Sequence, residues 1–141
     1  PNKTYFGEKD FQQLLVIKQL TNKYFKKIEV ISCETVRDRD GLALSSRNKK
    51  LSKKEISIAK KVFKLLINAR EILLKSTVKE SKQYIDDFFS QNKEIALDYY
   101  EIIDETNFSL VNSINNKKLY RLMIAFKIGK VRLIDNLSIK L

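Results

Sequence analysis

The chain has 141 residues and a formal net charge of +11 at pH 7, from 28 Lys and Arg against 17 Asp and Glu. It has no signal-peptide pattern, no apolar run near the roughly 20 residues that span a bilayer, and a single cysteine, Cys33, so we expect a cytoplasmic protein without a membrane partner. The absence of histidine excludes Ser-His and Cys-His nucleophiles and zinc binding through imidazole, and we predict no metal site on the chain.

The first predicted elements are a helix and a short strand. Apolar residues recur about every 3.6 positions between Lys9 and Lys27, which indicates a helix with a wide buried face. Residues 28–32 alternate apolar and polar and are rich in β-branched side chains, which favours a strand. One helix and one strand cannot bury both faces of a sheet. We therefore predict that residues 1–35 are the end of a larger parallel-sheet domain whose earlier part is missing.

A polar loop and two capped helices are expected next. Residues 35–48 lose any hydrophobic period, so we predict a connecting loop, a domain boundary and a positive φ at Gly41. Ser52-Lys53-Lys54-Glu55 and Thr77-Val78-Lys79-Glu80 both match the capping box that opens a helix. Each predicted helix would pack an apolar face against the core. This face consists of Ala59, Phe63, Leu66, Ala69 and Leu73 in the first helix and of Ile85, Phe88 and Phe89 in the second.

The last third of the chain reads as strands. We predict strands at residues 97–103, 119–127 and 131–137, with a hairpin turn at Gly129 between the last two. This pattern predicts a three-stranded antiparallel sheet with the two capped helices on one face. Residues 36–141 are thus expected to form an α+β domain.

The stretch from Tyr5 to Gln13, with the sequence YFGEKDFQQ, is the first candidate site. Gly7 leaves room for a ligand next to the backbone, and the following helix start presents free N–H groups. The helix dipole disfavours a cation such as Lys9 at this end, which suggests a functional reason for it. Gln13 lies on the same helix face as Asp10 and can bond a hydroxyl or a carboxylate. The alternative is a loop glycine, two surface charges and a solvated glutamine.

The second candidate site is the loop of Leu44, Ser45, Ser46 and Arg47, within the sequence DGLALSSRN. Two hydroxyls and a guanidinium on a loop that follows a glycine are suited to hold phosphate charge. The alternative is a loop that enters a helix, with serines acting as caps.

Together, YFGEKDFQQ, VRDRDGLALSSRN and the ending KVRLIDNLSIKL closely resemble the C-terminal half of the pantothenate synthetase family. Enzymes of this family join pantoate to β-alanine through a pantoyl-adenylate, with release of AMP and pyrophosphate. The resemblance implies that residues 1–35 end a Rossmann-like nucleotide-binding domain similar to that of class I aminoacyl-tRNA synthetases. Residues 36–141 would be a lid domain, and the serine-rich loop would correspond to their mobile KMSKS-type loop.

The resemblance also implies roles for the residues of both motifs. Lys9 would contact phosphate, Asp10 the ribose, and Gln13 pantoate. Val36 would touch adenine through its backbone. The complete implied ATP site consists of Gly7, Glu8, Lys9, Asp10, Val36, Leu44, Ser45, Ser46 and Arg47, of which Lys9, Ser45, Ser46 and Arg47 would be catalytic.

The implied co-substrate is ATP with Mg²⁺, and no tightly bound cofactor is expected. The resemblance covers only the back half of the family. The front half carries a histidine-containing phosphate motif, much of the pantoate pocket and the dimer contact. The implied partners are therefore the missing N-terminal half and, through it, a second copy, and the chain alone is expected to be inactive.

Two other functions remain open from the sequence. The positive charge permits a basic nucleic-acid-binding module, although the lysines lie mostly on predicted helical solvent faces without interleaved aromatic residues. The chain could also be a non-catalytic interaction domain, with the serine-rich loop acting only as a helix cap.

Overall fold

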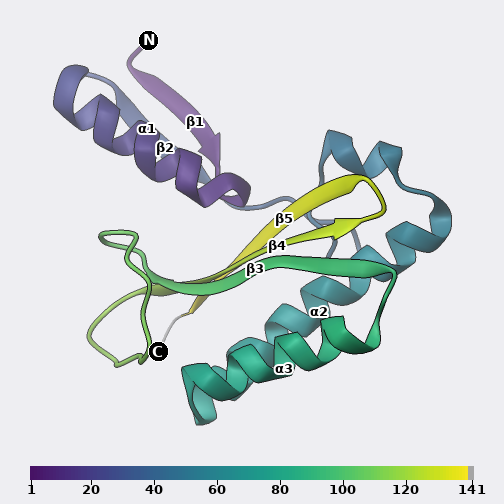
Figure 1. Cartoon of the computed structure of the whole chain (residues 1–141). Coiled ribbons are helices and arrows are strands. Elements are labelled where there is room, and N and C mark those ends of the chain that lie inside the picture. The colour runs from purple at the N-terminus through teal and green to yellow at the C-terminus, as the bar shows by residue number, and fades with distance from the viewer. Residues whose placement is uncertain (140–141) are drawn as a thin grey trace.

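The computed structural model describes residues 1–139, and its first part is a β–α–β unit (Figure 1). Strand β1 (Lys3–Gly7) leads through the short 3₁₀ helix η1 (Glu8–Asp10) into helix α1 (Phe11–Tyr24). Strand β2 (Glu29–Cys33) then pairs with β1 in parallel, with Lys3 opposite Glu29. The α/β character and the strand near residues 28–32 are confirmed.

Two details of the sequence prediction were wrong in this unit. Strand β1 was not predicted, because its apolar residues Tyr5 and Phe6 are adjacent and give no period of two. The predicted helix from Lys9 to Lys27 was too long. Its first residues form η1, and α1 ends at Tyr24 where the chain turns toward β2.

The remaining elements form an antiparallel sheet and two helices. Helices α2 (Lys53–Lys75) and α3 (Val78–Gln91) precede strands β3 (Ile95–Asp104), β4 (Tyr120–Ile128) and β5 (Val131–Ile139). The strand order is β3-β4-β5, with both pairs antiparallel as predicted. Gly129 has a φ of 54° in the turn between β4 and β5, a conformation that favours glycine.

Both predicted capping boxes are present. The Ser52 hydroxyl accepts from the Glu55 N–H, and the Glu55 carboxylate accepts from the Ser52 N–H at 2.8 Å. Thr77 and Glu80 make the same exchange at the start of α3. These bonds satisfy N–H groups that the helix itself leaves free, so each helix begins where the local sequence specifies.

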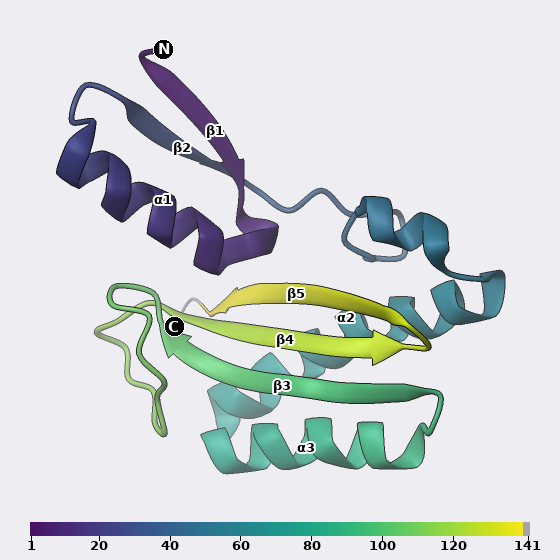
Figure 2. The same ribbon diagram turned by 45° about the horizontal axis from the view of Figure 1, so that its top comes forward.

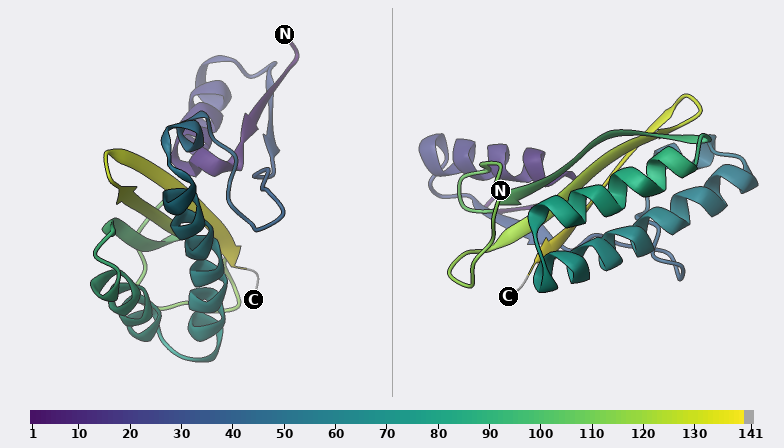
Figure 3. Two further views of the ribbon diagram at one scale, coloured as in Figure 1. Left: turned by 90° about the vertical axis from the view of Figure 1, so that its right-hand side faces the viewer. Right: turned by 60° about the horizontal axis from the view of Figure 1, so that its bottom comes forward.

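The antiparallel sheet is the middle of three layers (Figure 2). Helices α2 and α3 lie side by side across one face and bury residues such as Leu66, Ile85 and Leu122 in the main core (Figure 3). Helix α1 covers part of the other face, where Phe11 and Leu14 pack in a smaller core with sheet residues. Every residue of β4 except Lys127 is therefore buried, although an antiparallel strand often leaves one face in water.

The N-terminal unit is less completely covered. Exposed large apolar side chains gather there, namely Tyr5, Val16, Leu20, Tyr24 and Phe25. Parallel strands are usually covered on both faces, whereas α1 covers only one side of the β1–β2 pair (Figure 2). Within residues 1–139, no helix is both long and apolar enough to cross a membrane.

The main core generates a stability prediction on α2. Leu66 is fully buried, so Leu66→Ala should lower the free energy of unfolding by about 2 to 5 kcal/mol through lost burial and a residual cavity. The matched control is Leu74→Ala on the same helix, where the side chain is 42% exposed and the expected change is within about 0.5 kcal/mol. Urea unfolding of both variants measures the difference. Equal losses would contradict the assigned packing of α2.

Candidate functional site

The loop after β2 is held in shape by Gly41 and Phe63. Gly41 has a φ of 91°, as predicted, and a Cβ built on it would lie 2.1 Å from the Phe63 ring. Both the backbone conformation and the space therefore require glycine. The Arg37 guanidinium stacks on the same ring, 3.9 Å from its centroid. Arg37 also donates to the Gly41 carbonyl at 3.0 Å, which closes the loop on itself.

Arg37 joins this loop to strand β5. Its two terminal nitrogens donate to the two carboxylate oxygens of Asp135, each at 2.7 Å. The side chain of Asp135 is only 7% exposed and that of Arg37 18%. A bidentate pair of this kind is strong and directional, so it sets the position of the loop on the sheet.

The serine-rich segment forms the short 3₁₀ helix η2 (Ser46–Lys50), which the sequence analysis did not predict as a separate element. The Ser45 hydroxyl accepts from the Arg47 N–H at 3.2 Å and thus caps η2. The Arg47 guanidinium donates to the Arg132 carbonyl on β5 at 3.0 Å. Ser45 therefore does act as a helix cap, which was the alternative interpretation. In this arrangement the Ser45 hydroxyl and the Arg47 guanidinium still lie beside β5.

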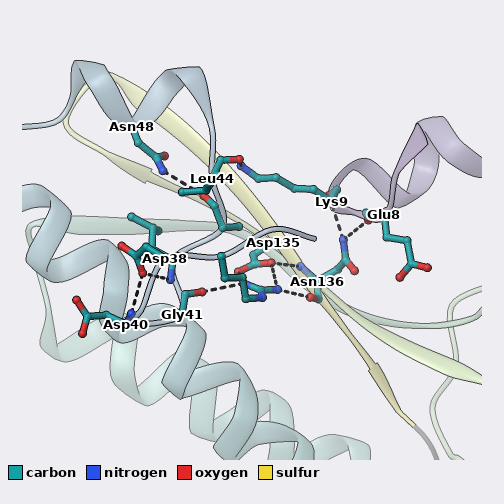
Figure 4. Close-up of polar contacts among 12 residues, drawn as sticks. Glu8, Lys9, Asp38, Asp40, Gly41, Leu44, Asn48, Asp135 and Asn136 are labelled. Atoms are coloured by element: carbon teal, nitrogen blue, oxygen red, sulfur yellow. Dashed lines mark hydrogen bonds and ion pairs between the residues drawn. The ribbon is translucent and has the colours of Figure 1, made fainter. Parts of the chain in front are cut away.

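Lys9 reaches from the N-terminal unit to this loop. Its Nζ donates to the Leu44 carbonyl at 3.2 Å, where Figure 4 shows the extended side chain. Burial lowers the pKa of Lys9 below its usual value. The Asp135 carboxylate partly opposes this shift, while the positive charges of Arg37 and Arg47 lower the pKa further. A half-buried ammonium beside two guanidiniums is an environment that an anion would stabilise.

Residues of both motifs line one open cleft of about 280 Å³. Gly7, Lys9 and Asp10 come from the first motif, and Ser45 and Arg47 from the second. Residues Arg132, Leu133 and Ile134 of β5 complete the lining. Lys9, Arg47 and Arg132 line the cleft with one carboxylate, that of Asp10, and Arg132 also pairs with Asp98 at 2.7 Å. The two remaining cations leave the cleft positive, as a polyphosphate would require.

Other predicted site residues lie outside this cleft. Glu8 turns away and its carboxylate meets Arg121 at 3.3 Å. Val36 is 67% exposed, and its carbonyl accepts from the Leu44 N–H at 2.9 Å. Ser46 and Gln13 have exposed side chains, and neither is among the cleft-lining residues of the described chain.

Asp10 and Gly7 each have a structural feature that bears on their assigned roles. The Asp10 carboxylate accepts from the Gln13 N–H at 3.2 Å and caps α1, so its second oxygen is the one left for a ligand. Gly7 has an ordinary extended conformation, and a Cβ there would meet nothing within 4 Å. Neither backbone strain nor packing within residues 1–139 explains the glycine.

Strand β5 contributes residues to the site that were not predicted from the sequence. Arg132 lines the cleft, while Asp135 and Asn136 hold the elements around it. The only available signal was a run of polar residues, Asp135 and Asn136, inside a predicted strand. Within residues 1–139, no group of three His, Cys, Asp or Glu side chains lies close enough to hold a metal ion.

The charge pattern at the cleft generates a titration prediction. Arg47→Met should raise the pKa of Lys9, because a neighbouring positive charge that disfavours the ammonium is removed. The pKa should stay below 10.5, since burial is the largest cause of its shift. Carbon NMR titration of lysine labelled at Cε measures the effect. Lys50→Met, also on η2, is the control and should leave the Lys9 pKa unchanged, and an equal shift in both variants would contradict the cleft electrostatics.

Residues 1–138 match the family described as Pantoate-beta-alanine ligase. The pantothenate synthetase of Bacteroides thetaiotaomicron is 37% identical over 99% of this chain and 50% of its own length. That of Acetivibrio thermocellus is also 37% identical, with the same coverage. The chain thus spans about half the length of the curated relatives it matches.

Solved structures agree with these matches. The pantothenate synthetase of Thermus thermophilus matches 100% of this chain and 51% of its own, with a TM-score of 0.90 and 32% identity. A pantoate-β-alanine ligase from Francisella tularensis, solved with beta-gamma ATP and β-alanine, matches 97% of this chain and 43% of its own. Its TM-score is 0.67 and its identity 36%. By sequence and by fold, the chain belongs to the pantoate–β-alanine ligase family.

Proposed function

We propose that the chain is the C-terminal half of an ATP-dependent ligase that joins pantoate to β-alanine through a pantoyl-adenylate. The observation that carries this proposal is the shared cleft in which Lys9 meets Ser45 and Arg47. In this proposal residues 1–35 end the nucleotide-binding domain, and residues 36–141 form the lid domain. ATP and β-alanine are present in the related Francisella structure, which supports both as substrates here.

The proposed reaction has two steps. A carboxylate oxygen of pantoate attacks the α-phosphorus of ATP, and the bond from that phosphorus to the bridging oxygen breaks, releasing pyrophosphate. The amine of β-alanine then attacks the acyl carbon, AMP leaves with the electrons of the acyl–oxygen bond, and the amine loses a proton. Both steps depend mainly on positioning and on stabilising charge at phosphorus.

The cationic groups of the cleft suit the first step. Lys9 and Arg47 would offset the negative charge that develops on the phosphate oxygens, and the Ser45 and Ser46 hydroxyls would donate to them. Ser46 is exposed at the start of η2, so its contact with phosphate requires the loop to close over the nucleotide. Mg²⁺ would arrive on the ATP phosphates, since this ion binds substrate phosphates and keeps several water ligands.

The other assigned residues would hold the rest of the substrates. The open space at Gly7 allows the nucleotide to approach the backbone. Asp10 would bind the ribose, and the Val36 backbone would contact adenine. Glu8, whose carboxylate faces Arg121, would line the ATP site through its backbone. Gln13, exposed in the first turn of α1, would bind pantoate.

The missing front half is the proposed partner. The chain spans half of its relatives, and the β1–β2 pair has one side that α1 does not cover. We propose that the front half adds to this pair, completes the pantoate and phosphate sites and forms a homodimer in the cytoplasm. The nucleic-acid alternative would use the lysines of α2, of which Lys54 pairs with Glu94 and Lys60 with Asp40.

Lys9→Ala is the direct test of the proposed catalysis. With the front half restored, it should lower the rate of pantoate-dependent ATP–pyrophosphate exchange about 10²-fold or more, through loss of charge stabilisation at the phosphates. Lys26→Ala, an exposed lysine just after α1, is the control and should retain the exchange rate. The 141-residue chain alone, which we propose to be inactive, is the blank. A Lys9→Ala enzyme with a normal exchange rate would remove Lys9 from the catalytic residues.

Closure of the serine-rich loop can be measured without catalysis. ATP added to the protein with its front half should slow hydrogen exchange of the amides of residues 44–48, because they become covered by the nucleotide. The polar loop at residues 112–118 is the internal control and should exchange at the same rate with and without ATP. Unchanged exchange at residues 44–48 under saturating ATP would contradict the proposed lid.

A further inference from the structure

We propose that Asn136 is a positioning residue whose side-chain amide clamps the backbone on both sides of Lys9 to strand β5. In this way it directs the Lys9 ammonium into the cleft. The catalytic importance of this Lys9 orientation rests on the proposed function. The clamp itself can be tested without an activity measurement.

The geometry of the clamp is specific. Asn136 Nδ2 donates to the Glu8 carbonyl at 2.8 Å and to the Lys9 carbonyl at 3.0 Å. Figure 4 shows the amide directly below these two residues, with a dashed line to each. The two carbonyls belong to the peptide groups on either side of the Lys9 Cα. Since φ and ψ of Lys9 describe how these peptide groups are rotated, holding both fixes the root of the Lys9 side chain.

Arg121 holds the Asn136 amide in the orientation that this clamp needs. An arginine can only donate, and its Nη1 lies 2.6 Å from Asn136 Oδ1. The nitrogen of the amide must therefore face the two carbonyls, which can only accept. Arg121 is itself fixed by Glu105, which accepts from its Nε at 2.8 Å, and by the Phe11 ring 3.9 Å away.

The clamp is buried, so its bonds are not easily replaced by water. Asn136 is 3% exposed and Arg121 5%. A polar group buried at this level without a partner is costly, which favours the clamped arrangement over one in which η1 moves off the strand. Lys9 emerges from the clamp toward the Leu44 carbonyl, and its ammonium lies at the cleft that Ser45 and Arg47 share.

Asn136→Asp removes the donor half of this amide and adds an acidic group. The carboxylate has nearly the same shape and still accepts from Arg121, but it places oxygen against the carbonyls of Glu8 and Lys9. Asn136→Ala is the second variant, because it breaks the clamp without adding a charge. Asn116→Asp, on an exposed loop, is the matched control for the chemical change.

The first experiment measures the arrangement directly. Spin labels are attached at Asn22→Cys on α1 and Lys79→Cys on α3, with Cys33→Ser to remove the native cysteine. Pulsed electron paramagnetic resonance then measures the distance between the N-terminal unit and the helices under the antiparallel sheet. We expect one narrow distance distribution in the parent and in the Asn116→Asp control, and a broadened or shifted one in both Asn136 variants. An unchanged distribution in Asn136→Asp and Asn136→Ala would overturn the clamp, whether or not the protein is a ligase.

The second experiment is a double-mutant cycle on ATP–pyrophosphate exchange with the front half restored. Asn136→Asp should lower the rate about 10²-fold in the parent, the scale expected when a catalytic group is displaced by about 1 Å. In a Lys9→Ala background it should lower the rate by no more than about twofold, because its effect passes through Lys9. An equal loss in both backgrounds would mean a general structural role and would overturn the positioning role. If the parent shows no exchange, the proposed function fails and the distance measurement alone decides the clamp.

Discussion

The candidate site depends on two neighbouring polar residues that are buried in an edge strand. Asp135 and Asn136 lie in β5 and are 6% and 3% exposed. A buried carboxylate or amide needs partners, and both find them in segments that precede α2. Arg37 binds Asp135, and the peptide groups around Lys9 bind Asn136. Removing one member of a buried ion pair typically lowers the free energy of unfolding by about 3 to 5 kcal/mol. These contacts therefore constrain how the loop before α2 and helix η1 lie on strand β5.

The same contacts create an electrostatic conflict at the cleft. Arg37 and Arg47 lower the pKa of Lys9, and burial lowers it more, while Asp135 alone among the named groups opposes the shift. A lowered pKa means that this environment disfavours the Lys9 ammonium relative to water. A cation kept in such a place is what a site for a polyanionic ligand needs, because the ligand relieves the repulsion when it binds.

Net charge has less to do with the site than this local arrangement. Most of the excess of +11 lies in residues 36–75, which contain 12 Lys and Arg against 4 Asp and Glu, and lysines such as Lys54 and Lys60 pair with carboxylates on neighbouring elements. The cleft is positive because Lys9 of η1 and Arg47 of η2, which are distant in sequence, meet there beside Arg132 of β5, which pairs with Asp98. Composition alone therefore suggested nucleic acid, whereas the geometry favours a small phosphate ligand.

The sequence by itself determined the features whose partners are close along the chain. The starts of α2 and α3 and the β4–β5 hairpin each depend on bonds or sterics within a few residues, so the local pattern specified them. The polar loop pattern also predicted the positive φ of Gly41, although the packing on Phe63 that requires glycine there is not local. The two motifs and their family resemblance indicated Lys9, Ser45 and Arg47 as site residues. Strand β1 was not predicted because it is stabilised by pairing with β2, which follows α1 in the sequence.

Only the tertiary structure decided how the site is held together. The bond from Arg37 to Asp135 spans 98 residues, and that from Asn136 to Glu8 spans 128. The tertiary structure also places two neighbouring residues on different sides, because Glu8 faces Arg121 and Lys9 faces the cleft. A side chain's type limits whether it can donate or accept, but the packing of layers selects which distant group it meets. That selection depends on burial and shape across the whole molecule, which no single segment encodes.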